Sequence, residues 1–105
     1  MSSMIMAYLT CADQAEADKI SRALLEAKLI ACARRLPVES MYWWEGKIEQ
    51  ASEQMLVMET VAEKFDAISR LVNTLHSYDT PALTATAVAH TTPAVEAWLA
   101  ENLAS

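Results

Sequence analysis

The sequence predicts an α+β fold in which helices cover one face of an antiparallel sheet. Short apolar segments of strand type alternate with segments whose apolar residues recur every three or four positions. Two long strand-like segments meet at Gly46, the single glycine of the chain, which marks a hairpin. With 105 residues, 53% of them apolar, residues 1–105 are expected to form one domain with its own core.

The first half of the chain begins with a strand and a helix. Residues 4–10 are apolar and end in turn-forming residues, which predicts a strand. Asp13 is the predicted N-cap of a helix, and Glu16, three residues later, completes a capping box. Apolar residues at spacings of three and four extend this helix to about Lys28. They are Ala17, Ile20, Leu24 and Ala27.

A long hairpin follows. Residues 29–44 are predicted to form a strand with a bulge or kink at Pro37, because proline cannot donate to the hydrogen-bond ladder. Residues 45–47, "EGK", form the turn, and Gly46 supplies the positive φ that the turn requires. The return strand is expected over 47–59, with a polar outer half and an apolar inner half. A hairpin of this length must project from a compact domain.

The second half contains two more helices and one strand. Thr60 and Glu63 form a second predicted capping box, and the helix they begin ends near His76. Residues 77–81 read as a loop and 82–90 as a strand, because the latter alternates and is rich in threonine. Thr92 and Pro93 then predict the start of a third helix. The residues expected to face inward from it are Val95, Trp98, Leu99 and Leu103.

This order, β-α-β-β-α-β with a C-terminal helix, is typical of a ferredoxin-like fold. Its sheet has one uncovered face, yet the strands here carry apolar residues on both faces. Tyr42, Trp43 and Trp44 add three consecutive aromatic side chains beside the turn. These side chains can pack within the chain itself, with their indole N–H and phenol O–H groups in contact with water at the edge of the packed surface. Alternatively, they are an interface with other copies of the chain, and we expect such an assembly to close as a ring.

Composition excludes several classes of protein. The net charge is −6 with eight Lys and Arg residues, so the basic stripe needed for nucleic acid is missing. A single glycine cannot build a P-loop or a dinucleotide fingerprint. No long apolar run or signal peptide is seen, so we expect no membrane span and a cytoplasmic location. Cys11 and Cys32 are then expected to be free thiols.

Three motifs in a fixed order resemble one family over the whole chain. They are "LIAC" at 29–32, "YWWEGKIE" at 42–49 and "HSYDTP" at 76–81, followed by a strand and a helix bearing Trp98. The sequence is similar to the CutA-type divalent-cation tolerance proteins. The resemblance implies a homotrimer whose sheets pack around a threefold axis, with the hairpin reaching across to neighbouring subunits. It also implies a shape like that of PII-type regulators, and hence a signalling alternative.

The same resemblance implies a link to copper and other divalent cations. His76 matches the histidine of the family's His-Pro-Tyr segment, although a histidine at a helix C-terminus is also a common cap. Cys11 lies just before a helix N-terminus, whose dipole is expected to lower its thiol pKa. Cys32, Met4 and Met6 are interpreted as hydrophobic core residues rather than metal ligands. No Cys-x-x-Cys or similar cage is present, so metal binding is expected to be weak or shared between subunits.

A cleft between subunits is the alternative site, and it could take a small molecule or a partner protein. The residues assigned to this cleft and interface are Tyr42, Trp43, Trp44, Glu59, Tyr78 and Asp79. Where the family has Lys-Thr, this chain has Glu59-Thr60, which reverses one charge. Ser77, Asp79 and Ala82 also depart from the family's loop pattern. These changes would make the cleft less attractive to anions.

Catalysis is the third reading and the least supported. Glu49, Glu53 and Glu59 share one face of the return strand, and paired carboxylates can perform acid–base chemistry. Residues four apart on a strand are too far from one another for that task, and no activated nucleophile accompanies them. A solvated strand face explains them better. We therefore predict a protein that is not an enzyme.

Overall fold

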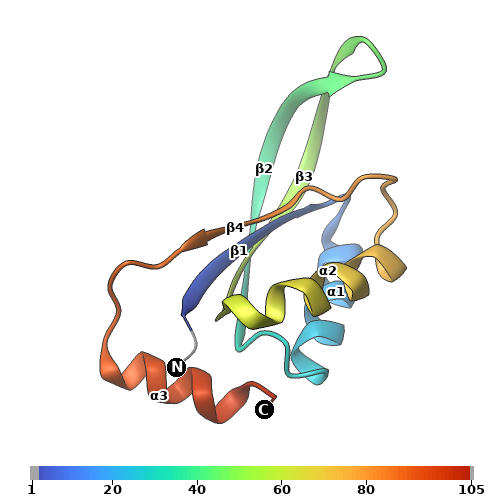
Figure 1. Cartoon of the computed structure of the whole chain (residues 1–105). Helices are drawn as coiled ribbons and strands as arrows, with labels where there is room; N and C mark the ends of the chain where they lie inside the picture. The colour runs from blue at the N-terminus through green and yellow to red at the C-terminus, as the bar shows by residue number, and fades with distance from the viewer. Residues whose placement is uncertain (1–2, 105) are drawn as a thin grey trace.

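The computed structural model describes residues 3–104 and contains an antiparallel four-stranded sheet with helices (Figure 1). The strand order is β2-β3-β1-β4, with every pairing antiparallel. The α+β fold class predicted from the sequence is confirmed. In chain order the elements are β1 (Met4–Cys11), α1 (Gln14–Glu26), β2 (Cys32–Trp44), β3 (Lys47–Val61), a 3-10 turn (Ala62–Lys64), α2 (Phe65–Leu75), β4 (Leu83–Ala87) and α3 (Pro93–Asn102).

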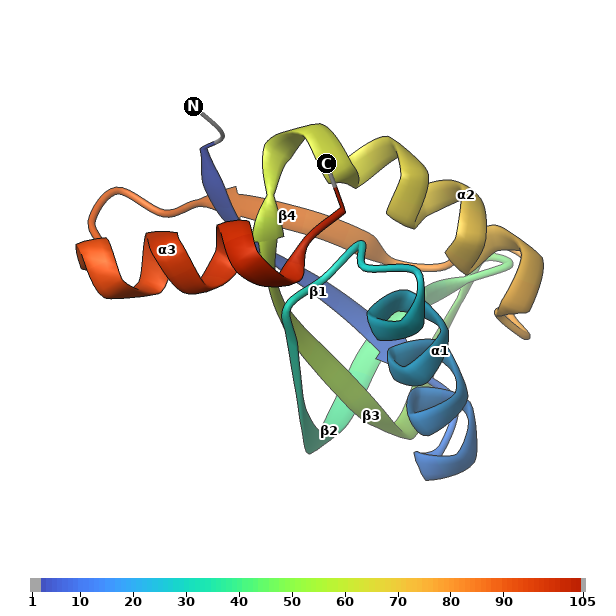
Figure 2. The same ribbon diagram turned by 90° about the horizontal axis from the view of Figure 1, so that it is seen from below.

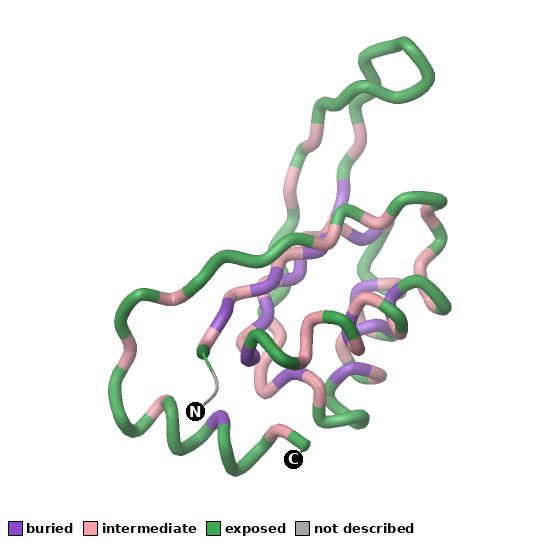
Figure 3. Tube along the Cα trace, in the orientation of Figure 1, coloured by how far each residue is buried: buried purple, intermediate pink, exposed green. Residues whose placement is uncertain are grey.

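The core lies between the sheet and the helices α1 and α2 on one of its faces (Figure 2). Strand β1 shows why: its residues alternate between buried and half-buried positions, as a strand with one covered face requires. The buried set includes Ile5, Ala7, Leu9 and Cys11. The opposite set points to the other face of the sheet, which α1 and α2 do not cover. Figure 3 shows this burial concentrated along β1 and the inner part of β3.

The β2–β3 hairpin extends well beyond this core and gives the molecule a long axis of 45 Å against 26 and 21 Å (Figure 1). Its outer part, 41–50, is exposed throughout. The turn has two residues in left-handed conformation, Glu45 at φ 49° and Gly46 at φ 77°. Gly46 was predicted to adopt positive φ, which is confirmed. Glu45 also adopts it, as a two-residue turn of this twist requires.

Pro37 does not interrupt β2, so the predicted bulge is wrong. The register with β3 runs unbroken through Leu36, Pro37 and Val38. Strand β2 lies at the edge of the sheet, where alternate N–H groups point away from its single partner. A proline is tolerated there without loss of a ladder bond. The strand also begins at Cys32 rather than at residue 29.

The second predicted capping box is also wrong. Thr60 belongs to β3, is fully buried, and donates its hydroxyl to the Leu29 carbonyl at 2.6 Å. Helix α2 begins only at Phe65, after the 3-10 turn, and neither start carries a side-chain cap. Burial of this threonine by β1 and the 28–31 connection outweighed its local capping preference. The first capping residue, Asp13, does accept from the Glu16 N–H as predicted.

Helix α3 starts as predicted, with the Thr92 hydroxyl accepting from the Val95 N–H and Pro93 in the first turn. Its inward face is narrower than predicted. Leu99 is buried, whereas Trp98 is exposed and Val95 is half-buried. The helix lies beside the sheet rather than over the core (Figure 2). Among residues 3–104, no helix has the length and apolar character that crossing a bilayer requires.

Candidate functional site

Three chemistry-bearing side chains converge where β1 ends. Atoms of Cys11, Glu16 and His76 that could bind a metal all lie within 4.8 Å of one another. Cys11 is the last residue of β1, Glu16 lies in the first turn of α1, and His76 caps the C-terminus of α2. The Asp13 cap fixes where α1 begins, and so turns Glu16 back towards the strand.

The His76 ring is fully buried and both of its nitrogens have partners. Nδ1 accepts a hydrogen bond from the Tyr78 N–H at 3.1 Å. Nε2 lies 2.8 Å from the Thr10 carbonyl oxygen, to which it donates in this tautomer. The expectation that His76 is a helix cap is therefore met only in part, because its ring joins β1 to the loop that follows α2.

Glu16 ties together the other side of the cluster. One carboxylate oxygen accepts from the Ala12 N–H at 2.9 Å and the other from the Ser77 N–H at 2.8 Å. Burial alone would raise the pKa of this carboxyl, but these hydrogen bonds and the nearby His76 hold it below its ordinary value. A negative charge is thus retained 3.7 Å from the His76 Nε2 atom.

The Cys11 thiol behaves opposite to the sequence-based expectation. Burial, followed by the charges of Glu16, Asp13 and Glu53, raises its pKa to about 12. The dipole of α1 was expected to lower this pKa, and that prediction is wrong. Desolvation and neighbouring carboxylates dominate because Cys11 faces the core rather than the end of the helix.

The cluster offers one sulfur, one nitrogen and one oxygen donor, a set suited to cations of borderline softness such as Cu²⁺ or Zn²⁺. The residues therefore fit such a cation by donor chemistry. Sequence analysis had singled out Cys11 and His76 and treated Glu16 as a helix cap alone. Its carboxylate accepts from the Ala12 N–H, one residue before the Asp13 N–H that a capping box would use, and no motif indicated a second role. The fold brings His76 to it across 60 residues of chain.

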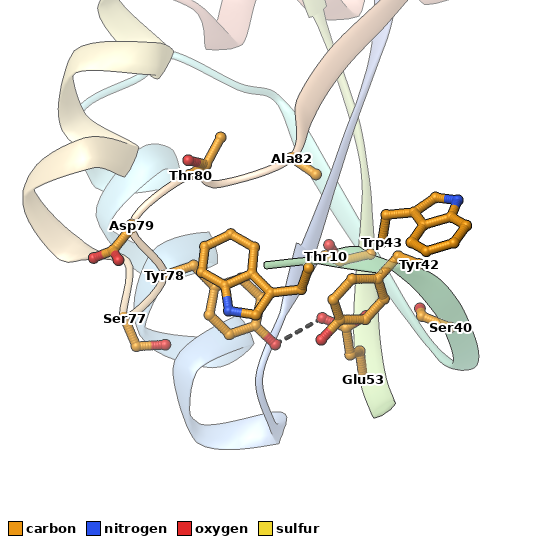
Figure 4. Close-up of a pocket in the computed structure, with 11 residues that line it drawn as sticks. Thr10, Ser40, Tyr42, Trp43, Glu53, Ser77, Tyr78, Asp79, Thr80 and Ala82 are labelled. Carbon is orange, nitrogen blue, oxygen red and sulfur yellow. Dashed lines mark hydrogen bonds between the residues drawn. The ribbon is translucent and has the colours of Figure 1, made fainter. Parts of the chain in front are cut away.

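A cavity of about 700 Å³ lies next to this cluster, between the hairpin and the loop after α2 (Figure 4). Five of the six residues assigned to the cleft line it: Tyr42, Trp43, Trp44, Tyr78 and Asp79. The remaining lining residues are Thr10, Ser40, Glu53, Ser77, Thr80 and Ala82. The structure thus gathers into one concave surface residues from β1, β2, β3 and the loop.

Glu53 was read as part of a solvated strand face, which is wrong. It is 6% exposed, and the Tyr78 hydroxyl donates to its carboxylate at 2.6 Å (Figure 4). Burial, reinforced by this hydrogen bond and the Glu53 charge, raises the pKa of Tyr78. The loop after α2 folds back over β3 and covers the carboxylate, an arrangement that strand periodicity alone cannot reveal.

Glu59 does not line this cavity. It lies on the open face of the sheet, opposite Cys32, and forms an ion pair with Arg34. The negative charge at this position is therefore balanced within the chain. Cys32 itself is half-buried, and His90 is an exposed residue between β4 and α3.

Comparison with known proteins agrees with this fold. A family model described as CutA1 divalent ion tolerance protein matches residues 5–102. The chain belongs to the CutA1 family. The divalent-cation tolerance protein CutA of Archaeoglobus fulgidus is 44% identical to it over 78 residues, which cover 74% of this chain and 76% of that protein. The protein of the same name from Thermotoga maritima is 35% identical over 100 residues, covering 95% and 99% of the two chains.

Solved structures of the family superpose closely on this one. The structure described as the periplasmic divalent cation tolerance protein CutA from Archaeoglobus fulgidus matches with a TM-score of 0.92 and 36% identity. The match covers 94% of this chain and 97% of that one. The resemblance inferred from the three sequence motifs is therefore confirmed.

Proposed function

We propose that this CutA1-family protein binds a divalent cation of borderline softness, such as Cu²⁺, through Cys11, His76 and Glu16, as its part in metal tolerance. The observation that carries the proposal is the approach of their donor atoms to within 4.8 Å. These donors come from three separate elements, so the folded chain brings them together. Zn²⁺ is the alternative occupant, since thiolate, imidazole and carboxylate all suit it.

The proposed site is expected to bind weakly near neutral pH. The Cys11 thiol must lose a proton to become a ligand, and its pKa is raised to about 12. His76 must also give up the bond between its Nε2 and the Thr10 carbonyl, or the one at Nδ1 from Tyr78. Affinity should rise with pH because proton release then opposes binding less. Below the thiol pKa, one released proton corresponds to about tenfold in affinity per pH unit.

Matched cysteine variants test this proposal. Titration with Co²⁺ as a spectroscopic probe should give a sulfur-to-metal absorption band in the native protein. The band should disappear in Cys11→Ser and persist in Cys32→Ser, because Cys32 lies on the other face of the sheet. Loss of the band in Cys32→Ser alone would contradict the assignment, as would equal bands in all three proteins. His90→Ala serves as the histidine control, since His90 is exposed.

The oligomer is proposed to be a homotrimer in which other copies of the chain cover the open sheet face. Supporting this, the β2–β3 hairpin exposes large apolar side chains, on the open face and beyond the core on the opposite face, although the chain otherwise has a well-formed core. Those more than 40% exposed include Leu36, Met41, Tyr42, Trp43, Trp44 and Ile48. Sedimentation should give a particle of three 11.6 kDa chains at micromolar concentration. A stable single chain would refute it.

A signalling module that binds a small molecule, as in PII-type regulators, is the second candidate function. The 700 Å³ cavity favours it, because its size falls within the range of small-molecule sites. A thermal-shift screen of metals beside small organic ligands separates the two functions, since a ligand of the folded state raises the melting temperature. Both roles are non-catalytic.

We further propose a cytoplasmic location, supported by two cysteines that remain unpaired. The Archaeoglobus relative is described as periplasmic. Fractionation of cells that produce the protein tests the proposal. Recovery with periplasmic markers would refute it.

A further inference from the structure

The cavity beside the hairpin carries negative charge and aromatic surface without a basic side chain in its lining. Its acidic residues are Glu53 and Asp79, and four of its lining residues are aromatic. No Lys, Arg or His is among the residues that line it. The whole chain has a net charge of −6, so the surrounding field has the same sign. Anions are disfavoured by such a site, and cations are favoured.

Glu53 supplies the strongest argument for a missing countercharge. Its residue is 6% exposed, and its carboxylate receives one hydrogen bond from the neutral Tyr78 hydroxyl. None of the ion pairs formed within residues 3–104 includes Glu53. Buried carboxylates are normally paired with a cation, because desolvation of a lone charge is costly. The cavity is where a partner of opposite charge can reach this group.

The aromatic residues are suited to the same kind of partner. Figure 4 shows the rings of Tyr42 and Tyr78 projecting into the space beside the Glu53 carboxylate. The face of an aromatic ring attracts an ammonium or guanidinium group, and its apolar area favours a hydrocarbon body. Carboxylate and rings together form two features of an ammonium-binding site. A bare metal ion would gain little from the rings.

We propose that this cavity binds a small organic cation, in which a protonated amine lies next to an aromatic or branched apolar body. The amine is placed at Glu53 and the body against Tyr42, Trp44 and Tyr78, in the cleft that these residues line and that, in the proposed trimer, lies where copies of the chain meet. A volume of about 700 Å³ accommodates such a molecule and exceeds what one basic side chain would fill. The proposal rests on the small-molecule candidate above and uses none of the three donors proposed for the cation site at Cys11.

Three probes that share a phenylethyl body and differ in charge test the charge requirement on the native protein in its natural assembly. They are 2-phenylethylammonium, the neutral 2-phenylethanol and the anionic 3-phenylpropionate, followed by titration calorimetry and tryptophan fluorescence. The ammonium compound should bind about tenfold or more tightly than the alcohol, because a charge-assisted hydrogen bond replaces a neutral one. The carboxylate should bind weakest. Equal affinities for ammonium and alcohol would overturn the proposal.

Two acidic residues of β3 provide the matched variants. Glu53→Gln removes the buried charge, keeps the shape, and leaves an acceptor for the Tyr78 hydroxyl. Glu49→Gln removes an exposed charge from the same strand, outside the cavity lining. We expect Glu53→Gln to reduce ammonium binding at least about tenfold and Glu49→Gln to leave it unchanged. Equal effects of the two variants would overturn the assignment, even if the probe series had favoured the ammonium.

A basic side chain from a second copy of the chain is the rival source of the countercharge. In that case Glu53→Gln would weaken the assembly in sedimentation, and the native protein would bind none of the probes. That result overturns the proposal. Co²⁺ titration of the native protein and its cysteine variants distinguishes this failure from failure of the metal proposal, since Glu53 is not among the three donor residues.

Discussion

The two faces of the sheet differ sharply although the same strands form both. On the helix-covered face, Leu9, Leu56 and Met58 have no exposed area. On the open face, Leu36 and Trp44 are 42% and 44% exposed. Within β3, Leu56 and Met58 are buried and the valine between them is half-buried, because side chains alternate across a strand. One chain completes the packing of the first face and leaves the second open.

The difference also separates the two candidate sites. The cluster at Cys11 lies on the covered side, where its hydrogen bonds are satisfied within the chain. The cavity at Glu53 opens beside the exposed hairpin and includes a buried charge that lacks a cation within residues 3–104. The Cys11 cluster can bind a metal ion only if some of these hydrogen bonds break. The cavity at Glu53, in contrast, can form a new ion pair with a bound cation without losing an existing one.

Trp44→Ala is expected to have the largest effect, and it tests whether the open face is covered in the native assembly. If a second copy buries this indole, the truncation should cost about 3–5 kcal/mol in the free energy of unfolding of the assembly. This loss of stability can be measured by urea unfolding at several protein concentrations, and sedimentation reports whether the variant still assembles. A fully assembled variant of unchanged stability would show that the open face is not completed through Trp44.

Leu56→Ala tests the covered face. Leu56 is fully buried between the sheet and the helices, so its truncation should cost about 2–5 kcal/mol in the free energy of unfolding. Val57→Ala is the neighbouring control, because Val57 points to the opposite face and is half-buried in the single chain. Its cost should be smaller and should depend on protein concentration if copies cover that face. A larger loss of stability in Val57→Ala than in Leu56→Ala would contradict the claim that the helix-covered face is the better-packed one.

The fold was predictable because its main signals are local. Helix periodicity, the Asp13 and Thr92 caps and the Gly46 turn each act within a few residues of chain. The errors arose where tertiary contacts overrode such preferences. Thr60 has the character of a cap, yet it donates to Leu29 from within a strand. Pro37 suggests a bulge, but an edge strand absorbs it without one.

The candidate sites were less predictable because they depend on contacts between distant segments. The motif resemblance singled out His76, and the position before a helix singled out Cys11, but nothing local indicated that Glu16 would lie close to both. The direction of the Cys11 pKa was wrong because burial depends on tertiary packing rather than on proximity to a helix end. Glu53 was overlooked for the same reason, since the Tyr78 loop that buries it is 25 residues away in sequence.

Acid should weaken the covered-side cluster through Glu16. The pKa of this carboxyl is lower in the folded protein than in the unfolded chain, so its ionised form stabilises the fold. That contribution is complete above the unfolded-state pKa and is lost as pH falls through the lower folded-state value. The stability difference between native protein and Glu16→Gln should therefore shrink between pH 7 and pH 3 in urea unfolding. A constant difference would contradict this, and exposed Glu49→Gln is the control.

Alkylation of the two thiols compares the two faces without any substitution, so it is the comparison with the smallest effect on stability. Cys11 faces the core with its pKa raised to about 12, whereas Cys32 is half-buried on the open face. Alkylation proceeds through the thiolate, so Cys11 should react only when the chain unfolds. Its rate should therefore follow the free energy of unfolding across a urea series, as mass spectrometry of the labelled peptides can measure. Cys32 should react by a separate route, whose rate rises on dilution if copies of the chain protect it. Labelling of Cys11 at a rate independent of urea would show that the covered face opens locally, and would place the cluster in a more dynamic region than its packing implies.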